Sequence, residues 1–172
     1  FASVFPRLAR RSLPLIVGAM ILTCGLYGLV IGYSHTARIA VQPLHRENPQ
    51  AQDYWDGNWL VTDIEVAVGS FKGRVQAALC APDFHRFREE LQRLQKELSG
   101  TASFSTMEEW LALTFTGDGI GHFKVVGHLI DSPGVGNTLS FELTCDQTEL
   151  PPMLHGLDAI CTAFPVLGEP AG

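Results

Sequence analysis

The chain has 172 residues, which suits one ordinary domain with an appendage, and its 46% of apolar residues against 17% of charged residues excludes a disordered chain. Charge is unevenly divided: residues 1–44 carry four arginines and no acidic residue, whereas residues 45–172 carry eight basic and 18 acidic residues, a formal charge of −10. A domain this acidic repels nucleic acid and attracts basic partners, so we predict no binding of DNA or RNA.

The first predicted element is an uncharged run of 23 residues, 12–34, which follows Arg7, Arg10 and Arg11. Its length and the flanking arginines predict a transmembrane helix whose N-terminal end lies in the cytoplasm. The alternative interpretation is that residues 1–36 are upstream sequence that is not native to the protein. A cleaved signal peptide is disfavoured, because no small-residue cleavage site follows the run.

Six strands are predicted in the rest of the chain from the alternation of apolar and polar side chains. Residues 37–44 alternate weakly and predict an opening strand. Residues 59–68 alternate strictly, and a Gly-Ser turn joins them to residues 71–79 in a predicted hairpin. Three further strands are predicted over residues 110–115, 122–130 and 138–145.

Two amphipathic helices are predicted. The first follows the hairpin, and its apolar residues recur at steps of three and four: they are Phe84, Phe87, Leu91, Leu94 and Leu98. The second covers residues 147–164, with Asp146 as its N-cap and Glu149 at capping-box spacing.

This order of elements, with short links between the strands, predicts an α+β fold. We expect one antiparallel sheet of about five to six strands with the two helices packed on one face. The domain is expected to cover residues 37–167, with residues 168–172 as a tail.

No motif for catalysis or for binding a metal ion stands out. The glycine-rich stretch 117–121 lacks the ending of a P-loop, the six histidines have no metal-ligand spacing, and no nucleophile elbow occurs. We therefore predict no catalytic residue, no metal, no cofactor and no enzymatic activity; a small enzyme with a scattered His/Asp/Glu site is the weaker alternative. The cysteines are interpreted as free thiols, with a Cys80–Cys145 or Cys145–Cys161 disulfide as the alternative.

Residues 53–60, DYWDGNWL, place three aromatic rings and two carboxylates at the entry to the predicted strand 59–68. One interpretation is structural: Trp55 and Trp59 cover the end of the sheet while Asp56-Gly57 makes a turn. The other is a recognition surface, because Tyr and Trp are enriched at interface hot spots.

The chain resembles the WapI-type family of bacterial immunity proteins over about residues 44–167. The resemblance rests on the block 53–60, on the stretch 117–127 (GDGIGHFKVVG), on Asp146-Gln147-Thr148, and on the Phe164-Pro165 end of the last helix. The chain departs from the family pattern in its first 36 residues and at Glu149, where an aromatic or aliphatic residue is expected. The resemblance implies a cytoplasmic protein that binds and neutralises a toxin of the same or a sister cell.

Many such toxins are basic nucleases, and an acidic inhibitor gains association rate by electrostatic steering. The expected partner is therefore a basic toxin domain. The predicted contact residues are Asp53, Tyr54, Trp55, Asp56, Trp59, Asp63 and Glu65. The alternative function is an accessory or sensor domain that residues 12–34 anchor in the inner membrane.

Overall fold

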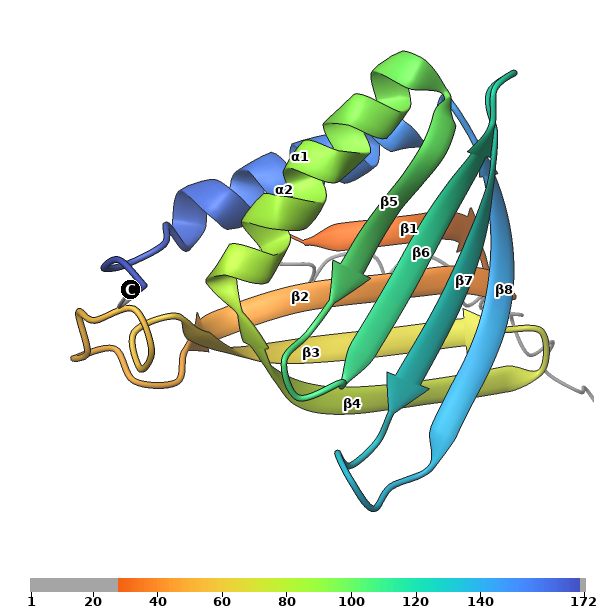
Figure 1. The fold of residues 1–172 in the computed structure, drawn as a ribbon. Coiled ribbons are helices and arrows are strands. Elements are labelled where there is room, and N and C mark those ends of the chain that lie inside the picture. Colours follow the sequence, from red (N-terminus) through yellow and green to blue (C-terminus); the bar gives the residue numbers. More distant parts are fainter. Residues whose placement is uncertain (1–27, 171–172) are drawn as a thin grey trace, which may run out of the picture.

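Four antiparallel strands followed by a helix occur twice in residues 28–170, the part of the chain that the computed structural model describes (Figure 1). The first unit comprises β1 (Leu29–Ser34), β2 (Ala37–Arg46), β3 (Trp59–Val68), β4 (Phe71–Cys80) and α1 (Ala81–Glu97). The second comprises β5 (Ser99–Ser105), β6 (Leu111–Asp118), β7 (His122–Ile130), β8 (Thr138–Asp146) and α2 (Leu150–Ala163).

The strands form two sheets, each with its strands in sequence order: β1-β2-β3-β4 and β5-β6-β7-β8. The α+β class is confirmed, but the prediction of one sheet with five to six strands is wrong. Two strands escaped prediction for different reasons. Strand β1 lies within the long uncharged run, where no alternation of apolar and polar residues marks it. Strand β5 has the sequence SGTASFS, whose two alternating apolar residues, Ala102 and Phe104, are too few to give a clear pattern.

Strand β1 occupies the end of the run that predicted a transmembrane helix. Leu29 pairs with Val41 and Ile31 with Ile39, and the side chains of these residues are fully buried. Residues 29–34 are therefore part of the folded core, and neither the helix through residue 34 nor a separate segment ending at residue 36 describes them. Residues 12–27 of the predicted span lie outside the described residues. Within residues 28–170, no helix is long and apolar enough to cross a membrane.

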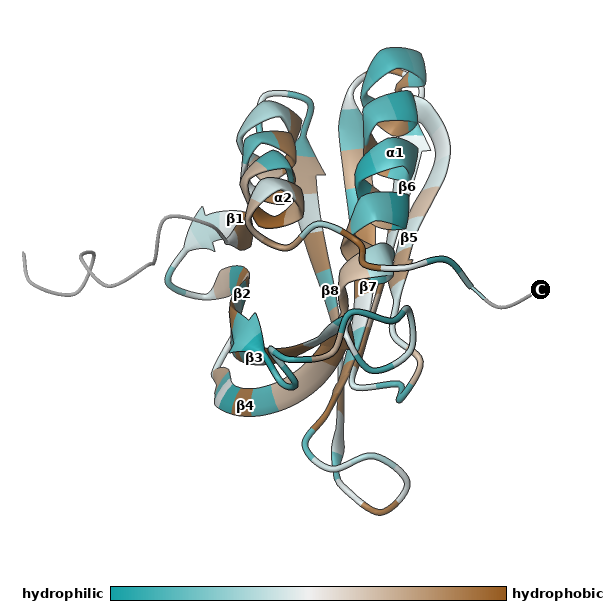
Figure 2. Cartoon of the chain, turned by 90° about the vertical axis from the view of Figure 1, so that its left-hand side faces the viewer, coloured by the Kyte–Doolittle hydropathy of each residue, from teal (hydrophilic) through white to brown (hydrophobic). Residues whose placement is uncertain are grey.

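The two helices lie side by side and close the open side between the sheets (Figures 1 and 2). Helix α1 contacts β5, the edge strand of the second sheet, while α2 contacts β1, the edge strand of the first. An ion pair between Arg88 and Asp158 links the two helices. The helices thus bridge two edge strands, and the expectation that they cover one face of a single sheet is wrong.

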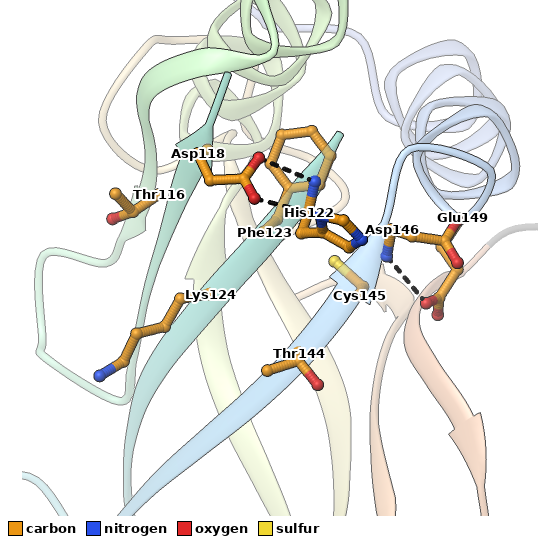
Figure 3. Close-up of a pocket in the computed structure, with 10 residues that line it drawn as sticks. Thr116, Asp118, His122, Phe123, Lys124, Thr144, Cys145, Asp146 and Glu149 are labelled. Atoms are coloured by element: carbon orange, nitrogen blue, oxygen red, sulfur yellow. Dashed lines mark hydrogen bonds and ion pairs between the residues drawn. The ribbon is translucent and has the colours of Figure 1, made fainter. Parts of the chain in front are cut away.

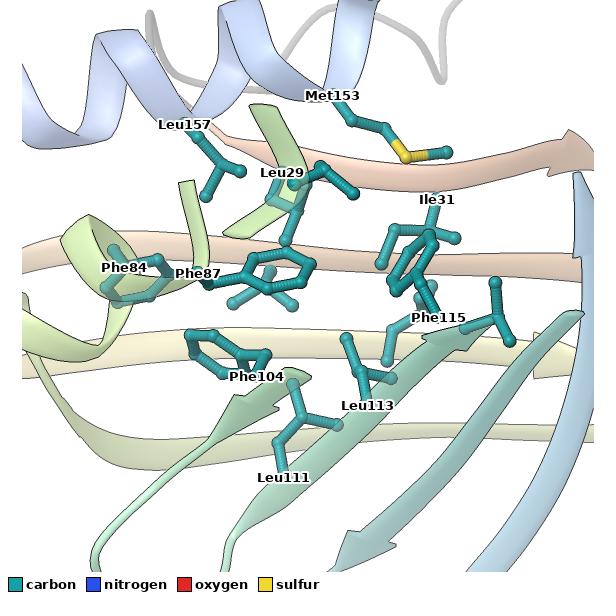
Figure 4. Packing of buried hydrophobic residues seen from close by; sticks show 14 of the residues in the cluster. Leu29, Ile31, Phe84, Phe87, Phe104, Leu111, Leu113, Phe115, Met153 and Leu157 are labelled. Carbon is teal, nitrogen blue, oxygen red and sulfur yellow. The ribbon is translucent and has the colours of Figure 1, made fainter. Parts of the chain in front are cut away.

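The core lies between the inner faces of the sheets and the helices (Figure 4). Phe84 and Phe87 of α1 reach Phe104 of β5, with ring centroids 5.2 and 5.6 Å apart, and Phe87 also reaches Phe115 at 5.6 Å. All four rings are fully buried, and burial of each stabilises the fold by about 1.5–3 kcal/mol. The predicted apolar stripe of α1 is confirmed at Phe84, Phe87, Leu91 and Leu94, which are buried. Leu98, its last predicted residue, caps the helix and is partly buried against the core.

Local signals placed some boundaries well and others less so. Strands β3 and β7 have the predicted bounds, whereas α2 begins at Leu150, three residues after the predicted start. The prediction of Asp146 as the N-cap is wrong, because Glu149 holds that position and makes no side-chain capping bond. The side chains of Asp146 and Glu149 instead hold the turn before the helix. The Glu149 carboxylate accepts the backbone N–H of Asp146 at 3.2 Å, and the Asp146 carboxylate accepts that of Thr148 at 2.7 Å.

Candidate functional site

The acidic and aromatic block lies in the loop of residues 47–58 between β2 and β3, which we call the β2–β3 loop. Within it, Asp53 Oδ1 accepts the backbone N–H groups of Trp55 and Asp56 at 3.0 and 2.9 Å. These bonds, that from Asp56 above all, hold the pKa of Asp53 below its ordinary value. Gly57 N–H donates to the Asp53 carbonyl at 3.1 Å. The Asp53 side chain therefore shapes the turn and is already engaged within the loop.

A buried asparagine holds this loop to the end of the chain. Asn58 is 1% exposed, and its Nδ2 donates to the carbonyl oxygens of Tyr54 and Leu167 at 2.8 and 2.9 Å. Its Oδ1 accepts the Leu167 N–H at 2.9 Å. Arg46 adds bonds from its guanidinium to the carbonyl oxygens of Gly57 and Pro165. Sequence reasoning missed both anchors, because their partners follow 109 and 119 residues later in the chain.

Trp55 is the exposed feature of the β2–β3 loop. Its side chain is 54% exposed and meets the Tyr54 ring edge-to-face, with centroids 5.3 Å apart and planes at 89°. Trp55 therefore does not cover the end of the sheet. Asp56 beside it is also exposed, while Trp59 is half-buried at the start of β3. The loop thus presents a supported indole next to a carboxylate.

The remaining two predicted contact residues lie farther along the outer face of β3. Glu65 is six residues beyond Trp59, a distance of about 20 Å along an extended strand. Asp63 is paired with Arg74, and Glu65 lies 3.8 Å from Arg38 and 3.9 Å from Arg74. The structure therefore groups residues 53–56 with Trp59, and it places Asp63 and Glu65 in a separate, charge-balanced region.

A pocket of about 580 Å³ opens near the end of the first sheet that lies opposite the β2–β3 loop (Figure 3). Strands β6, β7 and β8 and the start of α2 form its walls. Its lining consists of Thr116, Gly117, Asp118, His122, Phe123, Lys124, Thr144, Cys145, Asp146 and Glu149. Burial raises the pKa of Tyr33 in β1, and the nearby Glu149 and Cys145 raise it further.

Several acidic groups of this pocket hold turns, namely those of Asp118, Asp146 and Glu149, whereas Lys124 is paired with Glu142. Asp118 Oδ1 accepts the backbone N–H of Ile120 at 2.9 Å, its Oδ2 lies 3.1 Å from His122 Nδ1, and these bonds lower its pKa. Burial raises the pKa of the Cys145 thiol to about 12, so the thiol stays protonated and is a poor nucleophile at neutral pH. No cluster of three or more potential ligands in residues 28–170 is arranged to hold a metal ion.

Two of the sequence motifs meet at this pocket. The Gln147 N–H donates to the Gly121 carbonyl at 2.8 Å, which ties the β6–β7 turn to the link between β8 and α2. Gly121 has a φ of +101°, a conformation that side chains rarely adopt. The stretches 117–127 and 146–148 thus stabilise one another. The cysteines of the described chain, Cys80, Cys145 and Cys161, are free thiols, as the first interpretation predicted.

Comparison with known proteins gives one informative match. A model described as the immunity protein WapI-like family matches residues 30–165, which is most of the chain. Among solved structures, crystal structures of MRP1/MRP2 from Trypanosoma bruciei align over 81% of this chain and 85% of that chain. Their sequence identity is 16% and the TM-score is 0.43, values too low to carry an argument. No curated protein matches the chain.

Proposed function

Because the chain belongs to the WapI-like immunity protein family, we propose that it binds a bacterial toxin protein and neutralises it through the β2–β3 loop. The observation that carries this proposal is Trp55, an exposed indole on a loop that Asn58 and Arg46 fix to the folded body. A rigid aromatic side chain loses little entropy on binding, which is why Trp dominates many interfaces.

The partner in this proposal is a basic toxin domain. Residues 45–172 carry a formal charge of −10, which accelerates encounter with a positively charged surface. Tyr54, Trp55 and Asp56 make the central contacts, Asp53 orients them, and Trp59 extends the apolar area. Asp63 and Glu65 form the rim, where a partner's cations compete with Arg74 and Arg38.

The protein acts in this proposal by occluding the toxin rather than by catalysis. Burial raises the pKa of both Cys80 and Cys145 to about 12, so neither thiol is a ready nucleophile at neutral pH. We place the encounter in the cytoplasm. The membrane-anchored alternative depends on residues 12–27, which lie outside the described part of the chain.

The test is calorimetric titration of the full chain with the toxin domain encoded beside it, at low and at moderate salt. Trp55→Ala is expected to weaken binding by about 30-fold, since hot-spot truncations cost about 2 kcal/mol or more. At the rim, where Asp63 is already paired with Arg74, Asp63→Asn is expected to change binding by less than about fivefold. The absence of binding by the correctly folded, unmodified chain would refute the proposal.

A further inference from the structure

A second loop lies at the same end of the molecule as the β2–β3 loop. Residues 106–110, which we call the β5–β6 loop, leave the second sheet on the side that carries the β2–β3 loop (Figure 1). The link runs through the start of α1: Cys80, which pairs with Trp59 across β3 and β4, directly precedes the helix. Arg86 Nη2, in the second turn of that helix, donates to the Ser105 carbonyl at 3.1 Å, just before the β5–β6 loop. The Ala81 N–H also donates to the Asn58 carbonyl at 2.9 Å.

The two loops present the same combination of side chains. Met107 is 63% exposed, and Glu108 and Glu109 beside it are exposed as well. An exposed apolar side chain flanked by carboxylates thus occurs on both loops, with Trp55 and Asp56 on the other. None of these carboxylates takes part in the ion pairs of the described residues, which join Asp63, Glu65, Asp83, Asp118, Glu142 and Asp158 to cations.

The buried side chain of Thr106 holds the β5–β6 loop in place, and the backbone of the loop is strained at Glu109. Thr106 is 7% exposed, and its hydroxyl lies 3.4 Å from both the N–H and the carbonyl oxygen of Leu111. Glu109 has a φ of +56°, and its N–H donates to the Thr106 carbonyl at 3.1 Å. Gly and Asn adopt this left-handed conformation far more readily than Glu. Backbone strain at an exposed residue is often found at functional sites, so the conformation of Glu109 favours a role of its carboxylate in recognition.

We propose that the β5–β6 loop is the second half of the partner-binding surface. Met107 contacts apolar atoms of the partner, while Glu108 and Glu109 bind Lys or Arg side chains beside those that Asp56 binds. This inference rests on the proposed function, and its occupant is the same basic toxin domain. Three exposed carboxylates that take part in none of the ion pairs of the described residues, Asp56, Glu108 and Glu109, are complementary in charge to that class of partner.

The decisive variant is Glu109→Asn, because Asn removes the charge and suits the left-handed backbone. We expect it to keep or raise the melting temperature while it slows association with the toxin domain by about threefold at low salt, a difference that shrinks at moderate salt. A residue with a purely structural role would not show gained stability together with slower association. Met107→Ala is expected to raise the dissociation rate by about tenfold at either salt concentration.

The matched control is Glu97→Gln, which removes the same charge from the far end of α1. That helix has 17 residues, so the control lies about 25 Å from the loop. If Glu109→Asn and Met107→Ala bind like the control while Trp55→Ala binds weakly, the second loop is not part of the interface and the proposed function stands. If the unmodified chain does not bind the toxin domain, both proposals are overturned.

Discussion

Gly127 and Phe141 stand directly opposite each other on β7 and β8, and the Phe141 ring occupies the space above the glycine. A Cβ atom on Gly127 would lie 2.2 Å from the Cζ atom of that ring. Phe141 is 6% exposed, so the ring lies in the core and covers backbone that a glycine leaves bare. The pairing explains why the motif of residues 117–127 ends in glycine.

The first prediction follows from this packing. Gly127→Ala should lower the free energy of unfolding by about 1–3 kcal/mol, because the added methyl group forces the Phe141 ring out of place. Urea denaturation measures the change. The matched control is Gly73→Ala in β4, where the nearest atom to an added Cβ is Val66 Cγ1 at 3.6 Å. Equal stability of the two variants would contradict this account.

For Gly156→Ala, helix propensity and tertiary packing predict opposite effects on stability. Helix propensity alone favours Ala over Gly inside α2 by about 1 kcal/mol. In the structure, a Cβ on Gly156 would lie 2.2 Å from the carbonyl oxygen of Gly28, beside β1. We therefore expect Gly156→Ala to destabilise the fold by about 1–3 kcal/mol in thermal or urea unfolding. Thr162→Ala, at an exposed position of the same helix, should cost less than about 0.5 kcal/mol.

Asn58 should be the most sensitive residue of the acidic and aromatic block. Asn58→Ala removes the bonds to Tyr54 and Leu167 and leaves partly buried backbone groups without this partner, which costs about 1–3 kcal/mol. Limited proteolysis should then release the segment after Pro165 before the domain unfolds. Asp56→Asn provides the comparison, because its exposed side chain should leave both stability and cleavage unchanged. Resistance of the Asn58→Ala variant to cleavage would remove this asparagine as the anchor.

Asp83 should make stability depend on pH with an unusual sign. It lies 8% exposed at the start of α1, and burial raises its pKa although Arg86 Nη2, 2.9 Å from Oδ1, opposes the shift. A raised carboxyl pKa means that the folded state binds more protons than the unfolded state, so this group costs stability as pH rises above about 3.9. The gain in unfolding free energy from Asp83→Asn should therefore be smallest in acid and grow as the pH rises above about 3.9. A gain that is largest in acid would show that the carboxylate stabilises the fold.

Much of the secondary structure was predictable because it depends on local periodicity. The alternation in β3 and β7 and the apolar stripe of α1 are properties of consecutive residues, and each matches the structure. Strand β1 was not, because its alternation is lost in an apolar run of helix-spanning length. The sequence also determined the acidic charge of the domain and the motifs that relate it to its family.

Only the tertiary structure decided how those elements assemble and which side chains remain free to act. Asn58 meets Leu167 across 109 residues of chain, and no local pattern predicts a contact at that separation. The sequence predicts Asp63 and Glu65 as contact residues for a basic partner, but the folded sheet places them beside Arg74 and Arg38. Conversely, Met107 and Glu109 belong to no motif in the sequence, and it is the fold that brings their loop to the end that carries the β2–β3 loop. Periodicity is a property of neighbours in sequence, whereas a surface is made by neighbours in space.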